Sequence, residues 1–123
     1  YVGEGDLQTN NGLLHFETVD AANMGEMNKE SHFAYLDADK IEWPLLYRTW
    51  QSTDYFYPLG LRKKKKLNHF LGSLKLSPAI KQRIGVLTMG DKLLWVVGKR
   101  IDDRYKMTPQ TTSVLIITLL DRF

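Results

Sequence analysis

The spacing of apolar residues changes along this chain, and that change limits the folds available to it. Leu14 and Phe16 alternate with His15 and Glu17, which is the period of a half-buried β-strand. Residues 113–120 are apolar on both faces, as in a strand inside a sheet. Similar patterns, bounded by turn residues, predict strands over residues 13–19, 31–36, 45–50, 86–89, 92–97 and 113–120.

A helical spacing occupies the middle of the chain. Leu67, Phe70, Leu71 and Leu74 recur at the intervals that place side chains on one face of a short amphipathic helix. The strand pattern resumes only after Gly85. The middle of the chain is therefore expected to be helical.

A second short helix is expected directly after the first. Ser77 is an N-cap residue followed by a proline in the first turn, and Gly85 is expected to end the helix. Ile80 and Ile84 are expected to face the core. Together, these patterns predict an α+β fold: a mixed or antiparallel sheet with two short helices inserted between strands.

Composition excludes several classes of protein. With no cysteine among its 123 residues, the chain has no disulfides, thiolate metal sites, iron–sulfur clusters or cysteine nucleophiles. Its longest apolar run, within residues 114–120, is far shorter than the roughly 20 residues of a membrane-spanning helix. We expect a soluble cytoplasmic domain with no membrane partner. Because the chain begins at Tyr1 rather than Met, we also expect it to be a fragment of a longer protein.

Charge is distributed unevenly between the two halves. Residues 1–61 carry ten acidic and three basic side chains, a formal charge of −7, whereas residues 62–123 carry fourteen basic and four acidic ones, a charge of +10. Such asymmetry indicates a polyanionic partner for the basic half. A solvated basic face that balances the acidic half explains it equally well.

The densest basic cluster is the run Arg62-Lys63-Lys64-Lys65-Lys66, immediately before the first predicted helix. Cations at a helix N-terminus oppose the helix dipole, so their repetition there makes sense if an anion such as an RNA phosphate binds beside them. A loop whose charge aids solubility is the alternative. Other basic side chains that would extend such a surface are Lys75, Lys81, Arg83, Lys99, Arg100, Arg104 and Lys106.

Aromatic residues lie among these bases, and stacking on unpaired RNA bases is one use for them. Trp50, Phe56 and Trp95 are instead expected in the core, because they alternate with other apolar residues. The sequence lacks the RNP1 and GxxG motifs of common RNA-binding modules. Phosphate and shape recognition is therefore favoured over base readout.

No catalytic site is expected. His15, His32 and His69 lack metal-ligand spacing, and no metal site is expected. The pairs Asp37/Asp39 and Asp102/Asp103 suit turns and strand ends better than a metal or acid–base site. A hydrolase built on Asp102 and Asp103 is a remote alternative.

An ordered set of short motifs resembles the C-terminal domain of bacterial tRNA(Ile)-lysidine synthetase. The resemblance extends over roughly residues 31–120. Its motifs, in chain order, are Leu45-Leu46-Tyr47-Arg48-Thr49-Trp50, Asp54-Tyr55-Phe56-Tyr57-Pro58-Leu59-Gly60, Lys65-Lys66-Leu67, Phe70-Leu71, Arg83, Leu93-Leu94-Trp95-Val96-Val97-Gly98 and Arg100-Ile101-Asp102-Asp103-Arg104.

The resemblance implies a parent enzyme, a ligase that uses ATP with Mg to adenylate the wobble cytidine of an isoleucine tRNA and then joins it to lysine. In that family the chemistry belongs to an N-terminal domain with an SGGxDS loop, which is absent here. The fragment itself would carry no cofactor, and lysine and ATP would bind elsewhere in the parent. Its C-terminal domain is implied to hold the tRNA towards the acceptor stem.

These lines of reasoning assign residues 31–123 to the RNA-binding domain and residues 1–30 to a linker or the edge of a preceding region with one strand. The alternative function is a self-association module, in which the acidic half of one copy meets the basic half of another. The expected RNA phosphate-binding residues are Arg62, Lys63, Lys64, Lys65, Lys66, Lys81, Arg83, Arg100 and Arg104.

Overall fold

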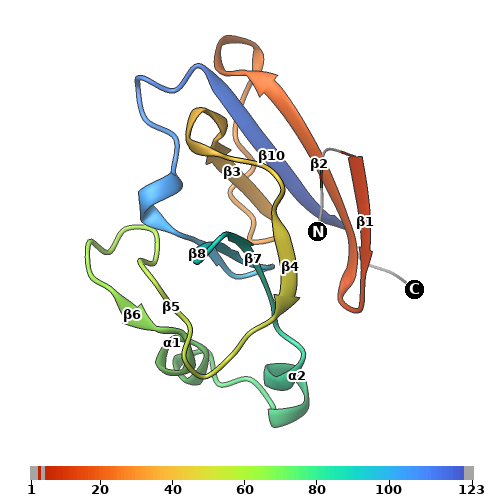
Figure 1. Cartoon of the computed structure of the whole chain (residues 1–123), viewed down its shortest axis with the longest axis vertical. Helices are drawn as coiled ribbons and strands as arrows, with labels where there is room; N and C mark the ends of the chain where they lie inside the picture. Colours follow the sequence, from red (N-terminus) through yellow and green to blue (C-terminus); the bar gives the residue numbers. More distant parts are fainter. Residues whose placement is uncertain (1–2, 4, 121–123) are drawn as a thin grey trace.

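The chain forms antiparallel sheets and two short α-helices (Figure 1). The computed structural model describes residue 3 and residues 5–120. Glu4, Asp121 and Arg122, which contribute to the charge asymmetry, lie outside the described residues. The predicted α+β class is confirmed, and every strand pairing among the described residues is antiparallel.

The first sheet has the strand order β1-β2-β10-β3. Its strands are β1 (Gly5–Thr9), β2 (Gly12–Asp20), β3 (Phe33–Asp37) and β10 (Ser113–Leu120). β10 pairs with β2 on one side and with β3 on the other, which confirms its predicted interior position. Residues 1–30 thus contribute two strands to the sheet that residues 31–123 complete.

The second sheet has the order β4-β7-β8-β9, and a two-stranded ribbon lies beside it. Its strands are β4 (Leu46–Thr49), β7 (Gly85–Met89), β8 (Lys92–Val96) and β9 (Arg100–Ile101). The ribbon consists of β5 (Tyr55–Phe56) and β6 (Lys65–Lys66). The helices are α1 (Leu67–Ser73) and α2 (Pro78–Gln82), and 3-10 turns cover Ala21–Asn23, Ala38–Lys40 and Asp103–Tyr105.

The second sheet is buried on both faces. Leu87 and Leu94 pack in a cluster with the first sheet, whereas Val86, Leu93 and Val96 pack in another cluster with α1 and β5. Residues of β7 and β8 therefore serve two cores, which explains why both strands read as nearly continuous apolar runs. Within the described residues, no helix has the length and apolar character needed to span a membrane.

Three details of the sequence prediction were wrong. β1 was not expected, because its five residues are mostly exposed and show no apolar alternation. Ile80 is 53% exposed rather than in the core, because α2 spans only five residues and has no buried residue, while Ile84 is buried as predicted. Gly85 is the first residue of β7 and not a helix cap. A Cβ at Gly85 would overlap the ring of Tyr47, so the close approach of that ring explains the glycine.

Candidate nucleic-acid interface

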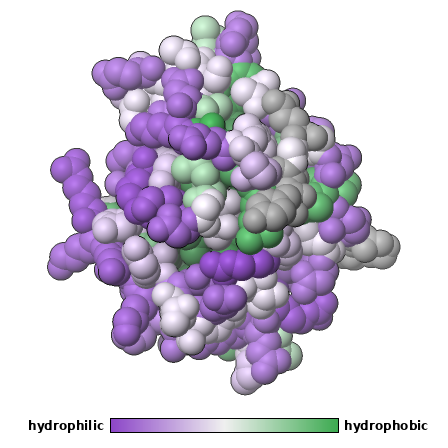
Figure 2. Space-filling view, in the orientation of Figure 1, coloured by the Kyte–Doolittle hydropathy of each residue, from purple (hydrophilic) through white to green (hydrophobic). Residues whose placement is uncertain are grey.

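Arg62–Lys66, hereafter the basic segment, lies in the loop before β6, in β6 itself, and directly before α1. Lys65 pairs with Phe56 and Lys66 with Tyr55 in the two-stranded ribbon. Because one end of the segment is part of a strand and leads into a helix, its direction is fixed relative to the core. Figure 2 shows long hydrophilic side chains projecting from the edge of the molecule where Figure 1 places β6 and the loop before it.

The charged groups of the basic segment are open to solvent. Arg62, Lys63, Lys64 and Lys66 are exposed and Lys65 is half-buried. None of the five forms a salt bridge with an acidic residue of the described chain. Lys64 Nζ lies 4.0 Å from the centroid of the Tyr55 ring, a cation–π contact that leaves the ammonium accessible. The segment therefore presents positive charge that no salt bridge in the described residues neutralises.

A salt bridge between Arg48 and Asp54 holds the part of the chain that precedes the basic segment. Arg48 of β4 donates from Nη1 and Nη2 to the two carboxylate oxygens of Asp54, at 2.9 and 2.7 Å. The backbone N–H of Gln51 also donates to this carboxylate, at 2.7 Å. Asp54 belonged to a predicted motif but was not expected to position the site, since no sequence pattern links it to Arg48.

Electrostatics at Asp54 favour the charged form. Partial burial raises the pKa of this carboxyl, but the hydrogen bonds from Arg48 and Gln51 and the charge of Arg48 outweigh it, so the pKa lies below its ordinary value. The pKa of Arg48 is raised, first by its hydrogen bond to Asp54. The pair is ionised throughout the neutral range.

Two further predicted residues adjoin α1. Lys81 Nζ donates to Asn68 Oδ1 of α1 at 2.9 Å, and the Arg100 guanidinium lies 5.3 Å from the centroid of the Phe70 ring. Arg100 forms no salt bridge with the described acidic residues. Lys81 and Arg100 therefore reach the same helix that the basic segment precedes.

Arg83 and Arg104 point to other partners. Arg83 Nη2 donates to the backbone carbonyl of Asn10 at 3.4 Å, near the turn between β1 and β2. Arg104 donates from Nε and Nη2 to the two oxygens of Asp102, both at 3.0 Å, and lies 4.4 Å over the Tyr57 ring. Much of the guanidinium of Arg104 is thus occupied by the protein itself.

Asp102 and Asp103 have structural partners rather than a catalytic arrangement. The Asp102 side chain is fully buried and also accepts hydrogen bonds from the N–H groups of Tyr57 and Arg104. Burial raises the pKa of Asp103. The hydrogen bonds from the Gly60 N–H and the Lys106 ammonium and the charges of Lys106 and Arg62 lower this pKa by a larger amount, so the net shift is downward. In the described part of the chain, no three His, Cys, Asp or Glu side chains are grouped to hold a metal ion.

The aromatic residues divide as the sequence predicted. Phe56 and Trp95 are buried, and Trp50 is half-buried with its indole Nε1 donating to the Lys81 carbonyl at 2.7 Å. Tyr55 is 41% exposed beside the basic segment. The surface near α1 therefore combines free cations with one exposed aromatic ring.

Comparison with known proteins finds a matching family and curated relatives. Residues 42–117 match the family described as TilS substrate C-terminal domain. A tRNA(Ile)-lysidine synthase from Parabacteroides distasonis is 40% identical over 94 residues, which cover 76% of this chain and 22% of that protein. One from Caldanaerobacter subterraneus is 31% identical over 106 residues, covering 86% of this chain and 23% of that protein. The chain thus spans about a fifth of the length of these curated relatives.

Solved structures show the same fold. A crystal structure of a TilS C-terminal domain superposes with a TM-score of 0.82 at 17% identity, covering 97% of this chain and 92% of that one. An N-terminal fragment of the phenylalanyl-tRNA synthetase β-subunit from Pyrococcus horikoshii gives a TM-score of 0.57 at 22% identity, covering 69% of this chain and 27% of that one.

Proposed function

The chain belongs to the family of TilS substrate C-terminal domains, and on that premise we propose that it is the non-catalytic, tRNA-binding domain of a tRNA(Ile)-lysidine synthase. The parent enzyme is a cytoplasmic ATP-dependent ligase that joins lysine to the wobble cytidine of an isoleucine tRNA. ATP with Mg and lysine bind in its N-terminal domain, and this chain binds the tRNA on its acceptor-stem side.

The observation that carries the proposal is the unpaired charge of the basic segment. None of these five consecutive cations forms a salt bridge among the described residues, although the charge of Arg62 acts on the Asp103 carboxylate. A cation already neutralised by the protein gains little from a phosphate, whereas a free one releases counterions from the RNA when it binds. We assign phosphate contacts first to Arg62, Lys63, Lys64, Lys65 and Lys66.

Lys81 and Arg100 extend this surface across α1, because both side chains contact that helix. Arg83 and Arg104 have peripheral roles, since Arg83 bonds near the β1–β2 turn and the guanidinium of Arg104 is paired with Asp102. The lysines rather than the helix end supply the attraction: the first helical N–H, that of Leu67, already donates to the Asp54 carbonyl at 2.9 Å. Recognition of phosphates in this way depends on RNA shape and strongly on salt.

A matched pair of variants tests the proposal. Lys63→Gln combined with Lys64→Gln removes two positive charges from the basic segment. Lys40→Glu changes the net charge by the same amount, but at a residue just after the C-terminal end of β3. In fluorescence-anisotropy titrations with an isoleucine tRNA, we expect the double variant to weaken binding about tenfold and to reduce the log–log salt slope by roughly two. Lys40→Glu should change both much less.

Equal effects of the two variants would show that only net charge matters and would remove the basic segment from the site. In the full-length parent, glutamate at positions 63–66 should weaken tRNA binding while ATP use by the catalytic domain persists.

Sedimentation of the chain without RNA tests the rival function: salt-sensitive self-association would favour a module in which acidic and basic faces of two copies meet.

A further inference from the structure

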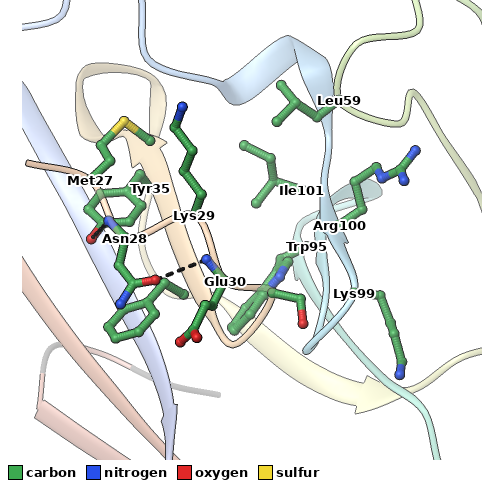
Figure 3. Close-up of a pocket in the computed structure, with 12 residues that line it drawn as sticks. Met27, Asn28, Lys29, Glu30, Tyr35, Leu59, Trp95, Lys99, Arg100 and Ile101 are labelled. Carbon is green, nitrogen blue, oxygen red and sulfur yellow. Dashed lines mark hydrogen bonds between the residues drawn. The ribbon is translucent and has the colours of Figure 1, made fainter.

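A cavity of about 400 Å³ lies between the two large sheets. One side is formed by β3, the other by β8 and β9, and the segment before β3 borders it (Figure 3). We call it the aromatic pocket; its lining relevant here consists of Lys29, Phe33, Tyr35, Trp95, Lys99 and Arg100. Its size falls in the range of pockets that hold small molecules, about 300–1,000 Å³.

Three aromatic residues, Phe33, Tyr35 and Trp95, belong to the pocket lining. Tyr35 and Trp95 are buried, with 9% and 1% of their surface exposed, whereas Phe33 is half-buried and presents part of its ring. Phe33 and Tyr35 are two residues apart on β3 and stack with centroids 6.4 Å apart and planes at 25°. The backbone N–H of Asn28 donates to the Tyr35 hydroxyl at 3.0 Å and so fixes the bordering segment against this ring. The His32 ring packs against Phe33 with centroids 4.5 Å apart, but Phe33 is the least buried of the three lining rings and is therefore the one that a flat ligand would contact.

Positive charge lines the same pocket. Lys29, Lys99 and Arg100 all contribute to it, and Figure 3 shows their charged ends on different sides of the aromatic centre. None of the three forms a salt bridge with an acid in the described range of residues. The carboxylate that lines the pocket, Glu30, lies 3.5 Å from His32 Nε2. The lining thus carries a net positive charge around an apolar surface.

Arg100 and Leu59 connect the pocket to the elements around the basic segment. Arg100 lines the pocket while its guanidinium lies over Phe70 of α1. Leu59 also lines the pocket, and its N–H donates to the carbonyl of Ile101 in β9 at 3.1 Å. The chain then runs from Leu59 to Arg62, whose charge acts on the Asp103 carboxylate beside β9. Arg100, which both lines the pocket and contacts α1, is therefore the cation that an RNA held by the basic segment would share with the pocket.

We propose that the aromatic pocket binds one unpaired nucleotide of the RNA, with its base against Phe33 and its phosphate near Lys99 and Arg100. The inference rests on the proposed function, because the nucleotide is part of the RNA held by the basic segment. An unpaired nucleotide offers both a base face that can stack on Phe33 and a phosphate that can bind beside Lys99 and Arg100, whereas a paired nucleotide offers the phosphate but keeps its base stacked inside the helix. An acidic or purely apolar ligand would use only one of these features.

The test compares RNA hairpins that differ only in unpaired nucleotides. One hairpin is blunt, and two others carry a short unpaired extension at the 3′ or the 5′ end. Binding to the 123-residue chain is measured by fluorescence anisotropy at fixed salt. We expect one extended hairpin to bind more tightly than the blunt one by about fivefold to a hundredfold, the range that one base stacked on an aromatic ring provides.

Variants separate the pocket from the basic segment. Phe33→Ala should abolish the advantage of the extended hairpin and leave the affinity for the blunt hairpin unchanged. Lys99→Gln, which removes no buried ring, should reduce the same advantage several-fold, and Phe33→Tyr should retain it. Lys40→Gln, beyond the opposite end of β3, serves as the control and should change neither affinity. Thermal unfolding of each variant verifies that it is folded.

Equal binding of blunt and extended hairpins by the wild type would overturn the pocket assignment while leaving the proposed function intact. Absence of binding to every hairpin and to tRNA would overturn both. Free adenosine monophosphate and uridine monophosphate are tested as well. If either binds the chain as tightly as the extended hairpin does, the pocket belongs to a soluble ligand and the proposal is overturned. Loss of the advantage in Phe33→Ala and Lys99→Gln, with blunt binding unchanged, would support it.

Discussion

The backbone carbonyl of Asp54 accepts a hydrogen bond from the N–H of Leu67 at 2.9 Å, so the residue whose side chain is held by Arg48 also fixes the start of α1. The basic segment ends at Lys66, immediately before this bond. A chain of contacts therefore leads from β4 to the basic segment. Arg48 of β4 holds Asp54, Asp54 holds the first residue of α1, and the cations directly precede that residue.

Asp54→Asn should weaken the structure at this connection. The substitution removes one charge-assisted partner of Arg48 and leaves a half-buried guanidinium without its counter-ion. We expect the free energy of unfolding, measured by urea denaturation, to fall by about 2 kcal/mol. Asp91→Asn, at an acid that is 89% exposed, is the matched control and should change it much less. A fully stable Asp54→Asn variant would contradict the structural role given to the pair.

The stability that Asp54 contributes should depend on pH in a defined direction. Its pKa in the folded chain lies below the ordinary value that it regains on unfolding. The stabilisation is therefore present above the unfolded pKa and is lost as pH falls through the folded pKa. The difference in unfolding free energy between wild type and Asp54→Asn should be largest near neutral pH and should shrink in acid below about pH 4. A constant difference across that range would show that the charge of Asp54 is not responsible.

Elements with strong apolar patterns were predictable from the sequence. β10 was predicted with its observed bounds because apolar residues occupy both of its faces. The stripe of α1 likewise matches the buried residues Leu67, Phe70 and Leu71. Patterns of this kind are local, so the sequence shows them directly.

Features that depend on contacts between distant residues were not predictable. β1 has no apolar alternation and is a strand because it pairs with β2. The cations of the basic segment were recognised from their run, but only the structure shows that they lack acidic partners among the described residues while Arg104 is bound to Asp102. Phe33 and Trp95 come from separate parts of the chain, and no spacing indicates that they line one cavity.

Removing residues 1–30 tests the domain boundary expected from the sequence. β2 pairs with β10 over eight residues, and Leu14 and Phe16 of β2 are 0% and 2% exposed in the core. Loss of two such side chains removes about 3–6 kcal/mol of apolar burial and leaves one edge of β10 open. We expect residues 31–123 alone to unfold non-cooperatively or aggregate, as seen by circular dichroism and sedimentation. Cooperative unfolding of this fragment at wild-type stability would instead support a boundary at residue 30.

Two glycine substitutions should have opposite effects on stability. Gly85→Ala places a methyl group in the space of the Tyr47 ring, whose hydroxyl accepts a hydrogen bond from Asn11 Nδ2 at 2.8 Å near the β1–β2 turn. Overpacking of this kind costs about 1–3 kcal/mol. Gly72→Ala, within α1 and with no atom near the new methyl group, should stabilise the chain by up to about 1 kcal/mol.

Urea denaturation of both variants measures these changes, and a double-mutant cycle identifies their cause. If the Tyr47 ring is what excludes a side chain at position 85, Gly85→Ala should cost much less in a Tyr47→Ala background, because the methyl group then enters vacant space. The stabilisation by Gly72→Ala should be the same in both backgrounds. An unchanged penalty for Gly85→Ala without the ring would show that the backbone of β7, rather than Tyr47, requires glycine there.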